Sequence, residues 1–445
     1  MNRGRIVLLL FLAGAIGLTA LAVRTSWQDV HLNGGVDLRN RVVGARAMLA
    51  GENPYRLPPN SQLPESLQDV ERWRHPSVSR ITVPPTVLAV YGVFAGLPYP
   101  TQRLIWFALE WAALFVSIAT LASSVPDTSQ RLGFVAMSLV FAAASPGWRL
   151  HVERGQYYVF LLLLMCAAAR WAMSRGRDDW MAGVFLGLAV ALRPTLVVAL
   201  ILFWILRWRR AAAAGIVTAA ACAAMTLPVA GISVWRDYPE VIRGKQNEVI
   251  LGDWSRLPTP AEKAFVDGAD FRTTLYPRSA NLTSLVFFSL VRSGSHLQSP
   301  APLWLALNNA LALIAIGAPA LYLWRRRAHM SASAILTGSL MIALFAEYFF
   351  APIRWGYADV CLILPLCLLM PYVWRRRWFL VGTAAAMMVG EFAISQGPAS
   401  AIVVTLGWWT LLISGYRMDL HAGNRAPLGA EGVVPITAAR RTTTA

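Results

Sequence analysis

The sequence predicts an all-α polytopic membrane protein with about 11–13 transmembrane helices and two long extracytoplasmic loops. Three observations support this class. The 445 residues are 56% hydrophobic and only 14% charged, with a mean hydropathy of +0.50. The apolar residues gather in runs close to the length, about 20 residues, that a helix needs to cross a bilayer. The basic residues gather at the ends of these runs.

About a dozen apolar runs are candidate spans. They cover residues 6–23, 81–98, 104–122, 131–146, 155–173, 179–206, 211–231, 303–324, 332–350, 358–373, 378–394 and 398–415. The first run follows a basic N-terminus and lacks a clear small-residue cleavage site, so we expect an uncleaved span with a cytoplasmic N-terminus. Residues 1–418 are expected to form one transmembrane domain, and 419–445 a disordered cytoplasmic tail.

Clusters of arginine set the expected orientation. The net charge of +17 is concentrated at 207–210, 325–327 and 375–377, beside apolar runs, which is typical of cytoplasmic loops rather than of a nucleic-acid surface. With these clusters inside, the polar insertions 24–80 and 232–302 both lie outside and could build one site. We expect a multi-pass protein of the inner (plasma) membrane with that site facing the periplasm or exterior.

The middle of the chain admits two topologies. Arg175 and Arg177 indicate a cytoplasmic turn, which would divide 179–206 into two half-spans. Three apolar runs then lie between two points on the outer side, and an odd number of crossings cannot return the chain to the same side. Either 81–98 or 131–146 therefore does not fully cross the membrane. Alternatively, 179–206 is a single span and the turn before it lies outside.

The first outer loop carries a candidate general base. Asp37 precedes a predicted short helix in which Arg39, Arg41 and Arg46 oppose an apolar stripe. Such a helix suits the membrane interface, with its cations near lipid phosphates. A carboxylate there is placed to take a proton from an acceptor hydroxyl. The alternative is an N-cap, because Asp is preferred immediately before a helix.

Two arginines are candidate phosphate ligands. Arg193-Pro194 lies deep in an apolar run, where a charge is costly unless it faces a cavity or partner and where proline breaks the helix. An arginine in such a cavity suits a lipid phosphate. Arg354 begins another run and could also bind phosphate, oriented by Glu347 or Asp359. Its alternative is an interfacial arginine within an aromatic belt.

Metal and cofactor motifs are not apparent. The four cysteines lie in predicted spans without ligand spacing, and the six histidines form no ligand pattern. Pro84-Pro85 precedes an apolar run and favours the first turn of a helix.

Several short motifs occur in the order found in a known family. They are Val36-Asp37-Leu38, Gly51-Glu52-Asn53-Pro54-Tyr55, Pro84-Pro85, Gly155-Gln156-Tyr157, Gly183 to Pro194, Asn281, and Pro352 to Tyr357. In this order they resemble glycosyltransferase family 87, whose members are C-type (GT-C) membrane enzymes. The chain departs from the family pattern at four positions. Val83 replaces a tyrosine, Arg193 a lysine, Ala351 a serine and Tyr357 a histidine.

The resemblance implies a GT-C-type fold and a membrane glycosyltransferase. The donor would be a polyprenyl-phosphate hexose, commonly mannose, and the acceptor would be a lipid or a glycan. Membrane lipids would surround the protein as further partners. Asp37 would act as base in an inverting displacement, and Arg193 and Arg354 would hold the leaving phosphate. Gln156, Asn281 and Tyr357 would bind substrate. The resemblance implies no metal, cofactor or nucleic acid.

Other functions stay open at this level. A broken helix at Arg193-Pro194 is also typical of a transporter or flippase for lipid-linked sugars. A glycan polymerase or ligase would use similar lipid carriers. The missing family histidine at Tyr357 leaves an inactive scaffold as a third alternative.

Overall fold

The computed structural model describes residues 3–33, 35–57, 63–68, 81–125, 127–175, 179–251, 302–328, 330, 332–350 and 356–364. The predicted substrate residues Asn281 and Arg354 lie outside the described residues. So do the predicted spans after residue 373 and the predicted tail.

All regular elements in the described part are helical. They are α1 (Arg3–Asn33), α2 (Val36–Leu49), the 3-10 turn η2 (Glu65–Leu67), α3 (Pro85–Gly92), α4 (Tyr99–Ala122), α5 (Thr128–Ala144), α6 (Pro146–Arg154), α7 (Tyr158–Arg175), α8 (Trp180–Leu192), η3 (Pro194–Leu196), α9 (Val197–Ile205), α10 (Arg209–Leu251), α14 (Pro302–Arg326), α15 (Ala332–Phe350) and η5 (Gly356–Leu362). Three of these helices are long and apolar enough to cross a membrane, or four if the bent pair α6–α7 is one span. The described residues therefore confirm an all-α polytopic membrane protein.

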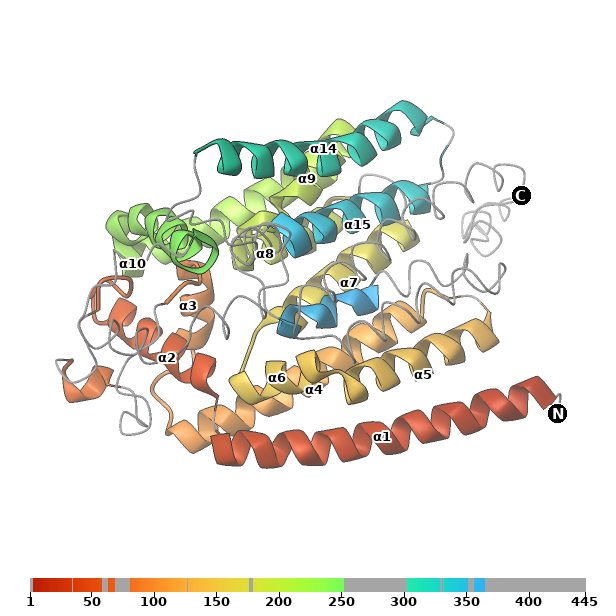
Figure 1. Ribbon diagram of the computed structural model, residues 1–445, viewed down its shortest axis with the longest axis horizontal. Helices are drawn as coiled ribbons and strands as arrows, with labels where there is room; N and C mark the ends of the chain where they lie inside the picture. The colour runs from red at the N-terminus through yellow and green to blue at the C-terminus, as the bar shows by residue number, and fades with distance from the viewer. Residues whose placement is uncertain are drawn as a thin grey trace, which may run out of the picture.

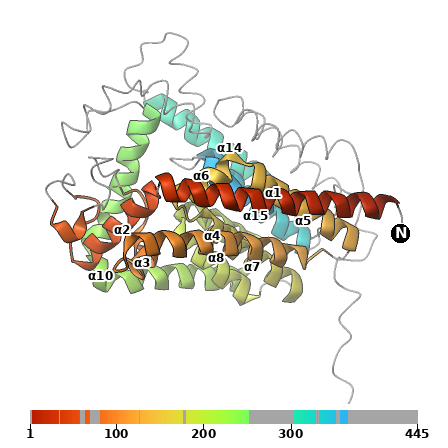
Figure 2. The same ribbon diagram turned by 90° about the horizontal axis from the view of Figure 1, so that it is seen from below.

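The long helices run roughly side by side, with α1 along one edge of the body (Figure 1). The shorter helices α2 and α3 gather with part of α10 at the end away from the N-terminus, and the view from below shows the same grouping (Figure 2). Polar residues of the first predicted outer loop therefore lie together at one end of the helix bundle.

The excess apolar run of the middle region is explained by α3. This helix has only 8 residues, and at about 1.5 Å per residue it cannot cross a bilayer. The run 81–98 is therefore not a span, which is one of the possibilities that the sequence left open. Pro85 occupies the first turn of α3, as expected for proline.

The predicted break in 179–206 is present. Arg193 leaves the helical conformation, with φ −140° and ψ 92°, between α8 and the turn η3. The helices α6 and α7 are bent by 113° at Gly155, whose φ of 69° is left-handed. A side-chain carbon at Gly155 would lie 2.6 Å from Leu38 Cβ, so this position needs glycine for both conformation and space.

Two helices extend further than the hydrophobic pattern predicted. The helix α1 continues to Asn33, beyond the apolar run that ends at residue 23. The helix α10 continues through a kink at Gly231 to Leu251, so the segment predicted as the loop 232–302 begins as helix. In both cases the helix continues past its apolar run, and its polar end contributes to the polar end of the molecule.

Glycines allow close packing between α8 and α10. A side-chain carbon at Gly183 would meet the backbone of Ala211, and one at Gly187 would meet the backbone of Gly215. Small residues that let two helix backbones approach are a common packing device in membranes. This contact fixes α8, and with it the break that carries Arg193.

Candidate active site

Asp37 is the second residue of α2. The N-cap position belongs to Gly35, whose φ is 54°, and no side chain caps the helix. The N-cap interpretation of Asp37 is therefore wrong. The backbone N–H of Gly35 donates to Glu153 O on α6 at 3.0 Å, which holds the start of α2 against the bend between α6 and α7. The Asp37 side chain is 20% exposed, so it is held by protein yet reachable.

The prediction of an interfacial α2 is wrong as well. Arg39 and Arg41 are only 2% and 7% exposed, and Arg46 donates from Nε to Ala95 O at 2.8 Å. These arginines point into the protein because polar groups from distant segments meet them there. The helix α2 is thus an internal element rather than a lipid-facing one.

The structure brings together Asp37 and Gln156, two residues predicted to belong to the site. The Gln156 amide Nε2 donates to Asp37 Oδ2. The guanidinium of Arg154 lies 3.9 Å from the same carboxylate oxygen. Asp37 therefore has a neutral donor and a cation beside it, both from the segment that joins α6 to α7.

Arg41 sets the orientation of the Gln156 amide. Its Nη2 donates to Gln156 Oε1 at 2.5 Å, and its Nη1 donates to Tyr91 OH and Gly155 O, each at 3.0 Å. Because Gln156 Oε1 accepts from Arg41, the amide N–H groups must face Asp37. The sequence interpretation missed this role of Arg41.

Three buried tyrosines border this polar cluster. The Arg41 guanidinium lies 5.0 Å from the ring centroid of Tyr157, whose ring stacks on Tyr158 at 5.0 Å. The Tyr158 and Tyr357 centroids are 5.5 Å apart. Burial, reinforced by the nearby charge of Asp37, raises the pKa of the Tyr357 phenol. This phenol therefore stays a neutral group.

Arg193 lies at the far side of the tyrosines. Its guanidinium is 5.6 Å from the ring centroid of Tyr158, and its Nε lies 2.7 Å from Glu347 Oε1. The Thr195 hydroxyl donates to the other oxygen of Glu347. Glu347, one of two residues predicted to orient Arg354, holds Arg193, and the prediction for Arg354 falls outside the described residues. The tyrosine cluster (Tyr157, Tyr158 and Tyr357) thus has a carboxylate at one side and an arginine at the other.

A second contact joins the segment after α2, predicted to belong to the first outer loop, to the extended end of α10. The Asn53 amide donates to Asp237 Oδ2 at 2.8 Å, and Arg56 Nε lies 2.6 Å from the same oxygen. The rings of Tyr55 and Tyr238 are 5.9 Å apart, and Tyr55 donates to Val83 O at 2.7 Å. Burial raises the pKa of Tyr55, in keeping with a neutral donor.

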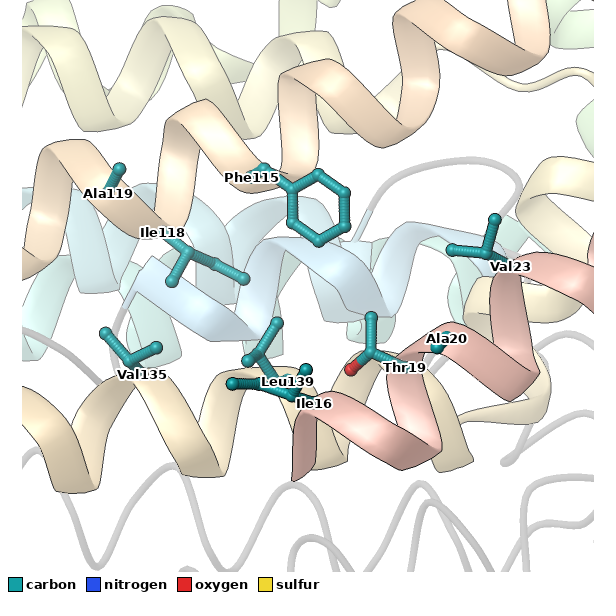
Figure 3. Close-up of a pocket in the computed structure, with 9 residues that line it drawn as sticks. All are labelled: Ile16, Thr19, Ala20, Val23, Phe115, Ile118, Ala119, Val135 and Leu139. Atoms are coloured by element: carbon teal, nitrogen blue, oxygen red, sulfur yellow. The ribbon is translucent and has the colours of Figure 1, made fainter. Parts of the chain in front are cut away.

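A separate cavity of about 420 Å³ lies between α1, α4 and α5 (Figure 3). Its lining consists of Ile16, Thr19, Ala20, Val23, Phe115, Ile118, Ala119, Val135 and Leu139. The hydroxyl of Thr19 is directed to its own helix, donating to Ala15 O at 2.8 Å. A site for a polar ligand needs convergent polar groups, so the polar cluster around Asp37 is the better candidate site. In the described part of the chain, no group of three or more His, Cys, Asp or Glu side chains could hold a metal ion.

Fold and site together define a polytopic membrane protein with a carboxylate, guanidinium groups and tyrosines at the ends of its helices. The family model for glycosyltransferase family 87 matches residues 82–346, more than half of the chain, and the chain belongs to this family. Comparisons with curated proteins and with solved structures gave no match. Membership implies a transferase enzyme with a sugar donor and an acceptor.

The matched region includes Gln156 and Arg193 but begins after Asp37 and ends before Tyr357. The proposed role of Asp37 therefore draws on its contact with Gln156, not on the family match.

Proposed function

We propose that this protein transfers a hexose, in the first instance mannose, from a polyprenyl-phosphate carrier to a lipid or glycan acceptor. The reaction takes place at the extracytoplasmic face of the plasma membrane and inverts the anomeric carbon. One observation carries the proposal. A partly exposed carboxylate, Asp37, is held by Gln156, a residue of the family-matched region.

In the proposed reaction, Asp37 is the general base. It takes the proton of an acceptor hydroxyl as that oxygen attacks the anomeric carbon, and the bond from this carbon to the carrier phosphate breaks. The polyprenyl phosphate leaves with the bonding electrons. The Gln156 amide, held by Arg41, keeps the carboxylate in one orientation, which favours proton transfer at a fixed geometry.

The leaving phosphate needs positive charge beside it. Arg193 supplies a guanidinium at the tyrosine cluster, 15% exposed at the side chain. Arg154 supplies a second one next to Asp37, and the sequence interpretation did not include it. We assign donor phosphate to Arg193 together with Arg354, and substrate contacts to Gln156, Asn281 and Tyr357.

The proposed orientation follows from the basic helix ends. Arg325 and Arg326 close α14, and Arg209 and Arg210 open α10, which is typical of cytoplasmic positions. The proposed site belongs to the opposite face, where a lipid-linked sugar is presented in the outer leaflet. Membership in a transferase family favours this function over a transporter or flippase.

The test is a transfer assay with the full-length protein in lipid. It is incubated with labelled polyprenyl-phosphate mannose and a membrane-lipid extract, and the products are identified. We expect labelled mannose on a lipid or glycan acceptor with inverted anomeric configuration. Transfer from a nucleotide sugar alone would contradict the proposed donor.

A further inference from the structure

A fully buried acid–imidazole pair lies behind the proposed site. Glu110 of α4 and His151 of α6 are both 0% exposed, with Oε1 and Nδ1 3.0 Å apart. Glu110 falls within a helix that is a candidate span, where an ionisable group is costly and marks a function. The reaction proposed above uses neither residue.

The backbone fixes the tautomer of His151. The N–H of Val159, in the first turn of α7, donates to His151 Nε2 at 3.2 Å. A neutral imidazole carries one proton, so that proton is on Nδ1, the nitrogen that faces Glu110. His151 thereby accepts from one of the N–H groups that the start of a helix leaves without an intrahelical partner.

The same two elements also hold the backbone of Gln156. Its N–H donates to His151 O at 3.0 Å, and the Trp106 indole donates to Gln156 O at 3.2 Å. Trp106 is one turn before Glu110 on α4, so the helix that carries Glu110 also holds the Gln156 carbonyl. The Gln156 backbone is thus held by His151 through its N–H and by α4 through its carbonyl.

We infer that Glu110 and His151 are positioning residues, which fix the Gly155–Gln156 bend and so hold the Gln156 amide against Asp37. This inference rests on the proposed function of Asp37. The chain of contacts runs from Glu110 to His151, then to the Gln156 backbone, which Trp106 of α4 also holds, and from the Gln156 side chain to Asp37. Neither positioning residue contacts substrate in this account.

The test is a double-mutant cycle in the full-length protein. Glu110→Gln keeps the shape but replaces the carboxyl group that lies 3.0 Å from His151 Nδ1 by an amide, so the bend should shift. We expect kcat for sugar transfer to fall on the order of tenfold or more, with KM for the donor unchanged. In a Gln156→Ala background the same change should have no further effect, because the link to Asp37 is already absent.

A matched control is Ser117→Ala, which removes another buried polar group of α4, one that donates to Ala113 O of its own helix. We expect wild-type kcat for this variant. Wild-type kcat in Glu110→Gln would overturn the inference. So would an equal loss in both backgrounds, as expected from a general loss of folded protein.

A readout without turnover separates this inference from the proposed function. In His151→Phe, hydrogen–deuterium exchange of the peptide that contains Val159 should accelerate while exchange in the middle of α4 stays unchanged. Absence of transfer by the wild-type protein would refute the proposed function alone. Unchanged exchange around Val159 would refute the positioning role.

Discussion

The ion pair between Arg193 and Glu347 is the second group of charged side chains at the candidate site, after Asp37 with Arg41 and Arg154. Both side chains are largely buried, at 15% and 7% exposure, and removing one partner of such a pair typically costs about 3–5 kcal/mol. We therefore expect Arg193→Gln to lower thermal stability strongly, and Arg193→Gln/Glu347→Gln to restore much of it.

The same pair of variants separates stability from binding. If Arg193 holds the donor phosphate, KM for the donor stays raised in the stable double variant. A double variant with wild-type stability and wild-type donor KM would leave Arg193 with a structural role only. Thermal unfolding and initial rates in lipid give the two quantities.

At the residue scale, the sequence indicated candidate site residues better than their partners, and the chemical roles of these residues stay predictions. Asp37, Gln156 and Arg193 lie around one tyrosine cluster, as their types and motifs indicated. Arg41 was misassigned because its basic side chain on a partly apolar helix is typical of an interfacial helix. Its acceptors at Gly155 and Gln156 are more than a hundred positions away along the chain, which no local pattern reveals.

At the scale of elements, the bend between α6 and α7 is the most sensitive junction. Gly155→Ala adds a carbon both at a positive φ and against Leu38. Gly51→Ala is the matched control, because its φ is also positive, 78°, with no atom within 4 Å of the added carbon. We expect both to lose about 1–2 kcal/mol from the left-handed conformation, and only Gly155→Ala to lose most of its kcat as well.

Thermal unfolding and transfer rates of the two variants test this expectation. Equal kcat in both would show that the position of the bend does not matter to the reaction.

The crossing of α8 and α10 gives a second prediction. Gly183→Val would drive a side chain into the Ala211 backbone, and overpacking of this kind costs about 1–3 kcal/mol. Gly17→Val on α1, where nothing lies within 4 Å, should leave the melting temperature unchanged. A melting temperature for Gly183→Val equal to that of Gly17→Val would contradict the packing described for α8.

Hydrophobic runs predicted most helices but not their ends. The run 81–98 had nearly the length of a span, yet Pro85 and the short α3 give it a different structure. The helices α1 and α10 continue into polar sequence because contacts at the polar end of the bundle stabilise them. One such contact joins Asn53 and Arg56 to Asp237 of α10. The length and hydropathy of a segment indicate whether it can enter a bilayer. Neither quantity predicts tertiary contacts between distant segments.

For the whole molecule, the proposal requires the polar end of the bundle to face away from the cytoplasm. In sealed cells, Glu52→Cys should react with a membrane-impermeant thiol reagent, because Glu52 is exposed in the segment predicted to form the first outer loop. Arg326→Cys, exposed at the end of α14, should react only after permeabilisation. The reverse pattern would put the site on the cytoplasmic side and exclude the proposed donor leaflet.

The central claim is that the Asp37 carboxylate is the base of the transfer reaction. Asp37→Asn keeps an oxygen that can accept from Gln156 but removes the basicity. A matched control is Asp29→Asn, which breaks an ion pair with the exposed Arg149 near the end of α1 and should cost little because water screens the arginine. Transfer rate and donor binding are measured for both variants in lipid. We predict that Asp37→Asn lowers kcat on the order of a hundredfold or more while binding donor as the wild type does. Wild-type turnover by Asp37→Asn would contradict the account.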